Sequence, residues 1–125
     1  MKTEKFTFKN PETDESFDFD VHSGDMNALR QLYALQEKII LMKDEKLSAG
    51  DIVALYDKIL AWVDFVIGDG GFNKIFGEHY GLQEIMNIFT ALGNFVIDSA
   101  KSVNEKYSAD NIGVPNESAD KSIAQ

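Results

Sequence analysis

The spacing of apolar residues changes near Gly24, and this change constrains the fold of the chain more than any other feature. Before Gly24, apolar and polar residues alternate over two short runs, as in β-strands with one buried face. After Gly24, apolar residues recur every three or four positions, as in amphipathic α-helices. The sequence therefore predicts a mainly α protein: a small bundle of three principal helices with an N-terminal β-hairpin.

The two alternating runs share one apolar face, formed by Phe6, Phe8, Phe17, Phe19 and Val21. Between them, residues 10–14 read Asn-Pro-Glu-Thr-Asp, a segment rich in turn-forming residues. Because an isolated two-stranded hairpin is only marginally stable in water, its phenylalanine face is expected to pack against the helices.

The first predicted helix, from about Asp25 to Lys46, carries two apolar stripes separated by Gln36 and Lys43. The first stripe contains Leu29, Tyr33 and Ile40, and the second contains Leu32, Leu35, Ile39 and Met42. One neighbour cannot cover both stripes. We predict that the second stripe binds another chain, because its spacing favours helix-on-helix contact. The open alternative is that the apolar face of the hairpin covers this stripe.

The second predicted helix begins at Ser48, because Ser48 and Asp51 have the spacing of a capping box. It runs to about Ile67 and ends at the glycine-rich residues 68–71, where Gly can adopt the left-handed backbone of a helix end. A short element from Phe72 to Phe76 follows. These two phenylalanines are spaced i, i+4 and share one side, where they either cap the core or face a partner.

The third principal helix is predicted from Leu82 to about Tyr107. Most of its apolar residues form one face, containing Leu82, Ile85, Met86, Phe89, Leu92, Val96 and Val103. Gly93 lies in that face and would let another helix approach closely. Ile88 and Phe95 lie off the stripe, and we predict them as a second partner-binding patch. The apolar residues of segment 108–125 are scattered and recur at neither helix nor strand spacing. The sequence therefore predicts a single domain over residues 1–107 and a flexible polar tail over 108–125.

Composition excludes several classes of protein. The 21 Asp and Glu against 12 Lys and Arg give a net charge of −9, which repels nucleic acid backbones. Cys is absent, so disulfides, thiolate nucleophiles and cysteine metal sites are excluded. Residues 1–9 lack the apolar run of a signal peptide, and the longest apolar run, Ile59 to Ile67, is interrupted by Asp64 and is too short to span a membrane. We therefore expect a soluble cytoplasmic protein.

No motif for catalysis, a metal or a cofactor stands out. Residues 68–72 read Gly-Asp-Gly-Gly-Phe, but this turn follows a helix and lacks the Lys and Ser/Thr of a phosphate-binding loop, as well as the ligand spacing of a calcium loop. His22 and His79, the two histidines, have no strong ligand at helical spacing. The sequence also lacks the Gly-x-Ser-x-Gly pattern of many serine hydrolases. We expect a protein without a cofactor that is not an enzyme.

One segment resembles a known family. Residues 61–77 read AWVDFVIGDGGFNKIFG, which resembles the aliphatic helix end, Gly-x-Gly turn and Phe-Gly of tail assembly chaperones from long-tailed phages and prophages of Gram-positive bacteria. The helix that follows, with Leu82, Ile85, Met86 and Phe89, is also similar, and the resemblance covers about residues 6–107.

This resemblance implies a non-enzymatic chaperone in the bacterial host cytoplasm that binds the tape-measure protein, recruits tail-tube subunits and is absent from the mature virion. It also implies that a frameshift near the end of the reading frame can yield a longer form. Self-association or partner binding would use the second stripe, Ile88, Phe95, Phe72 and Phe76. An acidic inhibitor that mimics nucleic acid, and a small hydrolase, are the alternative functions.

Overall fold

The computed structural model describes residues 1–110, with side chains through residue 107. In this part of the chain the elements are β1 (Thr3–Lys9), β2 (Ser16–His22), α1 (Met26–Met42), α2 (Ala49–Ile67), α3 (Gly71–Phe76) and α4 (Leu82–Asp110). The predicted fold class is confirmed: three long helices, one short helix and an N-terminal antiparallel hairpin. Helix α4 includes residues 108–110, which were predicted as tail, and the rest of the predicted tail, residues 111–125, lies outside the described residues.

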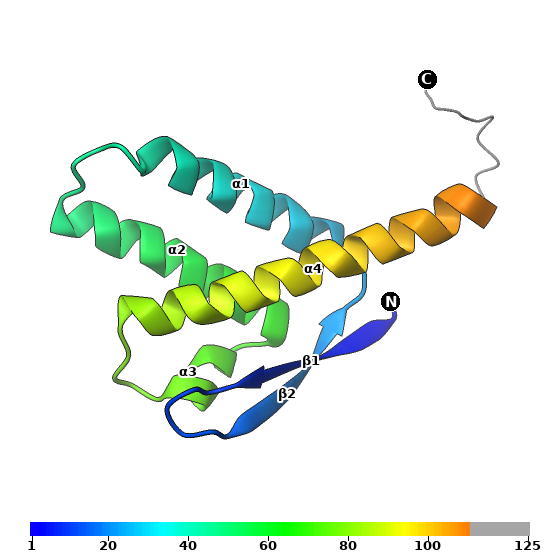
Figure 1. Ribbon diagram of the computed structural model, residues 1–125, viewed down its shortest axis with the longest axis horizontal. Coiled ribbons are helices and arrows are strands. Elements are labelled where there is room, and N and C mark those ends of the chain that lie inside the picture. Colours follow the sequence, from blue (N-terminus) through cyan, green and yellow to red (C-terminus); the bar gives the residue numbers. More distant parts are fainter. Residues whose placement is uncertain (111–125) are drawn as a thin grey trace.

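The three long helices pack together as a bundle, and the hairpin lies with α3 along one edge of this bundle (Figure 1). Helices α1 and α2 lie side by side, and α4 crosses both and contacts both. The hairpin packs on α2 and α4, near the short helix α3, and the C-terminal turns of α4 project beyond the rest of the molecule. Helix α4 therefore has α1, α2 and β1 as neighbours.

The hairpin has the apolar face that the sequence predicts, and most of that face is buried. Phe6 lies opposite Phe19, and Phe8 lies opposite Phe17. Phe6, Phe8, Phe19 and Val21 are buried, whereas Phe17 is partly buried. The ring of Phe6 meets Phe95 of α4 edge-on at 5.3 Å, and Phe8 meets Phe76 of α3 at 5.8 Å between centroids. The expectation that the hairpin packs against the helices is therefore confirmed.

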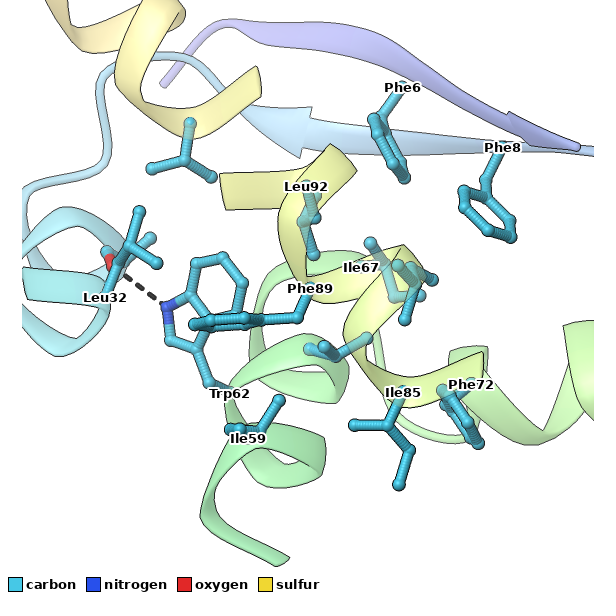
Figure 2. Packing of buried hydrophobic residues seen from close by; sticks show 14 of the residues in the cluster. Phe6, Phe8, Leu32, Ile59, Trp62, Ile67, Phe72, Ile85, Phe89 and Leu92 are labelled. Carbon is cyan, nitrogen blue, oxygen red and sulfur yellow. Dashed lines mark hydrogen bonds between the residues drawn. The ribbon is translucent and has the colours of Figure 1, made fainter. Parts of the chain in front are cut away.

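Trp62 occupies the centre of the helical core (Figure 2). Its indole Nε1 donates a hydrogen bond of 2.9 Å to the carbonyl oxygen of Ala28, and its ring meets Phe89 edge-on at 5.5 Å. The hydrogen bond joins α2 to the first turn of α1, and the aromatic contact joins α2 to α4. One side chain therefore links all three long helices.

Within residues 1–107, the side chains of two buried polar residues, Asn10 and Ser99, form hydrogen bonds to segments far away in the sequence. Asn10 of the hairpin turn donates from Nδ2 to the carbonyl oxygen of Ile75 at 3.1 Å. Ser99 of α4 accepts from the backbone N–H of Gly24 and donates to Glu4 Oε2, both at 3.0 Å. Because an unpaired buried polar group is costly, these bonds help to fix the position of the hairpin against α3 and α4.

The predicted boundaries of α2 have the local structure that the sequence indicates, whereas α1 ends at Met42, four residues before its predicted end at Lys46. Ser48 and Asp51 form the reciprocal bonds of a capping box, each 3.1 Å long, at the start of α2. At the other end, Gly68 has a φ of 110° and Gly70 a φ of 76°. The carboxylate of Asp64 accepts a bond of 3.0 Å from the Phe72 N–H, which holds α3 against the end of α2.

Candidate partner-binding surface

The structure corrects the predicted position of half of the partner-binding residues. Leu32, Leu35, Ile88 and Phe72 are buried within the chain, with exposed fractions of 1%, 8%, 0% and 2%. Met42, Ile39, Phe76 and Phe95 are partly buried. These four residues belong to the core of the folded chain, although Leu32 and Leu35 also line hollows at its surface.

Leu32 and Leu35 of the second stripe are buried, and Ile39 and Met42 are partly buried, because α2 and α4 both pack against α1. The other chain that we predicted is not needed to cover it, and the hairpin packs on α2 and α4 instead. Gly93 of α4 makes this contact close: a Cβ at that position would lie 3.4 Å from Leu32 Cδ1. The close approach expected at Gly93 is confirmed.

The off-stripe residues of α4 and the phenylalanines of α3 also have neighbours within the chain. Ile88 is buried, and Phe95 contacts Phe6 of the hairpin. The rings of Phe72 and Phe76 are 4.8 Å apart, and Phe72 also meets Tyr80 at 4.7 Å. Phe72 and Phe76 therefore cap the core next to the hairpin, the first of the two arrangements that the sequence left open.

The first stripe of α1 is an apolar surface that the fold leaves uncovered. Tyr33 is 63% exposed and Ile40 is 64% exposed. Met26 and Leu41, near the two ends of the helix, are exposed as well, and Leu29 is partly buried. Exposed apolar side chains are common one at a time, but a row of them along one helix marks a surface for binding.

This stripe borders a groove between α1 and α4, which we name the α1–α4 groove. It consists of two hollows that meet at Gln36, with volumes of about 360 and 340 Å³. The first is lined by Met26, Leu29, Arg30, Leu32, Tyr33, Gln36 and Ile97. The second is lined by Gln36, Ile39, Ile40, Met86, Phe89, Thr90, Gly93 and Asn94. Of the predicted partner-binding residues, Ile39 and Leu32 line this groove.

The walls of the α1–α4 groove carry almost no charge, although the protein as a whole is acidic. Among the described residues, Arg30 is the one charged residue in its walls, although the chain has 21 Asp and Glu. Its walls also contain no histidine. The groove therefore offers apolar contact and amide hydrogen bonds, and it has no group that could serve as a general base.

The two histidines lie apart from the groove. His22 ends β2, and His79 lies in the loop between α3 and α4, where it is exposed. Within residues 1–107, no three His, Asp or Glu side chains gather closely enough to hold a metal ion. In the described part of the chain, no helix has both the length and the apolar character needed to cross a membrane.

Comparison with known proteins identifies no relative of this chain. No protein-family model, curated protein or solved structure matches this chain. The resemblance to tail assembly chaperones thus stands on the residues quoted for it, namely 61–77 and the start of α4.

Proposed function

We propose that this chain is a non-enzymatic tail assembly chaperone that holds a helical segment of the tape-measure protein in the α1–α4 groove. The observation that carries the proposal is the exposed apolar stripe of α1, centred on Tyr33 and Ile40, beside a groove free of carboxylates. Recruitment of tail-tube subunits in the host cytoplasm is part of the same proposal.

The groove suits a helix better than an extended strand. Helix-in-groove recognition uses apolar anchors at i, i+3 or i+4, and i+7, and it buries them in a channel between two helices. From Leu29 to Ile40 the groove extends for about 16 Å at 1.5 Å per residue, which matches about three turns of a bound helix. The two hollows would receive anchors on either side of Gln36, whose amide can bond to a polar residue between them.

The charge distribution supports the same role. An assembly chaperone must expose apolar surface and still stay dispersed, and the net charge of −9 opposes non-specific association. Because the groove itself lacks this negative charge, an uncharged or mildly acidic helix can enter it without repulsion from the walls.

The proposal is tested by co-expressing this chain with the product of the long helical gene beside its own. We expect the two proteins to purify together, and we expect the Tyr33→Asp/Ile40→Asp variant to lose the partner. The matched control is Val53→Asp on α2, because Val53 is 58% exposed and lies outside the groove. Equal recovery of the partner by all three proteins would contradict the proposal.

The alternative function, an acidic inhibitor that mimics nucleic acid, predicts a different outcome of such binding experiments. Such a protein would capture a DNA-binding protein in a manner that weakens steeply with salt, because its contacts would be ionic. That capture would not depend on Tyr33 or Ile40.

A further inference from the structure

The hairpin is a two-stranded sheet, so each strand has one free edge. Along each strand, the backbone N–H and C=O groups of successive residues point alternately toward the other strand and toward the free edge. At one end of the hairpin, the Ser23 N–H donates to the Lys2 carbonyl oxygen at 2.8 Å. At the other end, the Asn10 N–H donates to the Glu15 carbonyl oxygen at 2.8 Å. With the strand register between them, these bonds show that every second residue of β2, from Ser16 to His22, points its backbone groups to the free edge.

This free edge of β2 has no partner in the described part of the chain. Within residues 1–107, the backbone–backbone hydrogen bonds outside the β1–β2 ladder and the helices do not involve Ser16, Asp18, Asp20 or His22. The side chains of these four residues are exposed, and the hairpin lies at the margin of the molecule (Figure 1). Such an edge is a template on which another extended segment can form backbone hydrogen bonds.

The charges along the hairpin determine which segment can pair with this edge. Asp18 and Asp20 carry exposed carboxylates on the outer face of β2. The lysines that share this face, Lys5 and Lys9, belong to β1 and therefore lie on the side away from the free edge of β2. Opposite charges on neighbouring strands attract and like charges repel, so the edge favours a basic strand over an acidic one. The net charge of −9 adds long-range attraction for the same basic segment.

The inner face of the sheet beside this edge is apolar and incompletely covered. Phe17 lies on that face and is partly buried, whereas Phe8, opposite it on β1, is buried. A strand added to β2 would place every second side chain on this inner face, next to Phe17 and Phe19, and the others on the outer face, next to Asp18 and Asp20. The edge therefore fits a segment in which apolar and basic residues alternate.

A second copy of this chain fits the edge poorly. Neighbouring strands lie about 4.8 Å apart, so two hairpins joined edge to edge would have centres about 10 Å apart. Each hairpin packs on two helices, α2 and α4, and one helix with its side chains is already about 10–12 Å wide. With both apolar faces on the same side of the sheet, the helices of the two copies would overlap. With the apolar faces on opposite sides, the helices of one copy would cover the carboxylates of the other, which is costly. A single extended segment meets neither obstacle.

We propose that the free edge of β2 binds an extended segment of a partner protein in which basic and apolar residues alternate. The Lys or Arg side chains of the segment lie beside Asp18 and Asp20, its apolar side chains lie beside Phe17, and its backbone bonds to the outward groups of β2. Strand β2 has seven residues, a length of about 23 Å at about 3.3 Å per residue, so the segment has about five to seven residues. This site is separate from the α1–α4 groove, and the inference does not depend on the tape-measure protein.

The test is an NMR titration of the full chain with the peptide Lys-Val-Lys-Val-Lys-Val-Lys. The amide shifts of Asp18 and Asp20 should move most, and those of Lys5 and Thr7 on the other edge should move little. A control peptide of the same composition, with all its lysines before its valines, should bind more weakly. Two further peptides carry N-methyl groups, one on every lysine and one on every valine. Because one set of peptide N–H groups points toward β2, one of these two should bind about tenfold more weakly or worse, and the other should bind as the parent does.

Variants of the chain separate backbone pairing from charge. Asp18→Pro removes an outward N–H and no bond of the β1–β2 ladder, so the variant is expected to fold, which circular dichroism checks. It should bind the alternating peptide about tenfold more weakly. The matched control, Lys5→Pro, makes the same change on the edge of β1 and should bind at least as well as the wild type. Asp18→Asn/Asp20→Asn keeps the edge and should weaken binding by about threefold to tenfold.

Several results would overturn the proposal. It is wrong if the peptide with clustered lysines binds as well as the alternating one, or if both N-methylated peptides bind as the parent does. It is equally wrong if no peptide shifts the amides of β2, or if the shifts map to β1 or to the α1–α4 groove. A dimer of the free chain that Asp18→Pro disrupts would assign the edge to a second copy instead.

Discussion

Gly71, the first residue of α3, shows how one position fixes the junction between two helices. A Cβ there would lie 2.6 Å from Cγ1 and Cδ1 of Ile67, a side chain that is itself buried. Gly71→Ala should therefore lower the free energy of unfolding by about 1–3 kcal/mol, because Ile67 must move within a packed core. Urea unfolding followed by circular dichroism measures this change.

Gly50 supplies the comparison for that measurement. It lies in the first turn of α2, where the nearest atom to an added Cβ is Ser48 Oγ at 3.7 Å. Gly50→Ala should raise the free energy of unfolding by up to about 1 kcal/mol, since Ala favours the helix and meets no obstacle. If both substitutions changed the free energy of unfolding by the same amount, the contact between a Cβ at residue 71 and Ile67 would not be the cause of the loss at Gly71.

The pKa of Lys38, which its side-chain interaction with Lys58 and the positive charge of Lys58 lower, predicts a pH dependence of stability. Because the pKa of Lys38 is lowered from its ordinary value of 10.5 in the folded chain, the unfolded chain binds more protons between the lowered pKa and 10.5. The free energy of unfolding then rises with pH in that window, and the destabilisation is fully present below it. Lys58→Gln removes the cause, so the variant should be more stable than the wild type at neutral pH, and this advantage should shrink toward pH 10.5.

Thermal unfolding of both proteins across this pH range checks the sign. Other lysines and tyrosines titrate in the same range, and the difference between variant and wild type cancels their contribution. A stability difference that stays constant with pH would contradict the lowered pKa of Lys38.

At the scale of elements, the sequence predicts which segments form and where they end. The change of apolar period near Gly24 separates the hairpin from the helices, and Ser48 and Gly68 mark the ends of α2. These signals are local: caps and turns depend on the backbone of a few residues, so they can be read without knowing the neighbours.

The same periodicity does not tell which stripe of α1 faces the core. It groups Leu32 with Leu35, and Tyr33 with Ile40, but burial depends on where α2 and α4 lie. A clue was present in the small residues Ala28 and Gly93, because helices approach most closely where side chains are small. Ala28 lies one turn before Leu32 and is buried beside Trp62, so it identifies the second stripe as the inner one.

The contact between the hairpin and α4 explains why Phe95 lies off the main stripe of that helix. Phe6 and Phe95 meet edge-on at 5.3 Å, and Phe6 is 4% exposed. A double-mutant cycle with Phe6→Leu and Phe95→Leu should give a coupling free energy of about 0.5–1.5 kcal/mol, the usual range for an aromatic pair. Additive effects of the two substitutions would mean that the rings contribute only through buried area.

At the scale of the whole molecule, a single core around Trp62 leaves one side of α1 uncovered. The candidate site could be predicted only in part. The sequence indicated that α1 has more apolar surface than one neighbour can bury, and Ile39 and Leu32 do line the α1–α4 groove. It could not indicate that Tyr33 and Ile40 are the outward residues, because this depends on the packing of three helices far apart in sequence.

The central claim is that the α1–α4 groove is the surface that holds the helical partner. Amide hydrogen exchange of the chain, alone and in complex with the co-purified partner, tests it most directly. The account predicts added protection on α1 from Met26 to Ile40 and on α4 from Met86 to Ile97, with little change in the hairpin. Protection confined to the hairpin or to α3, with α1 and α4 unchanged, would contradict the account.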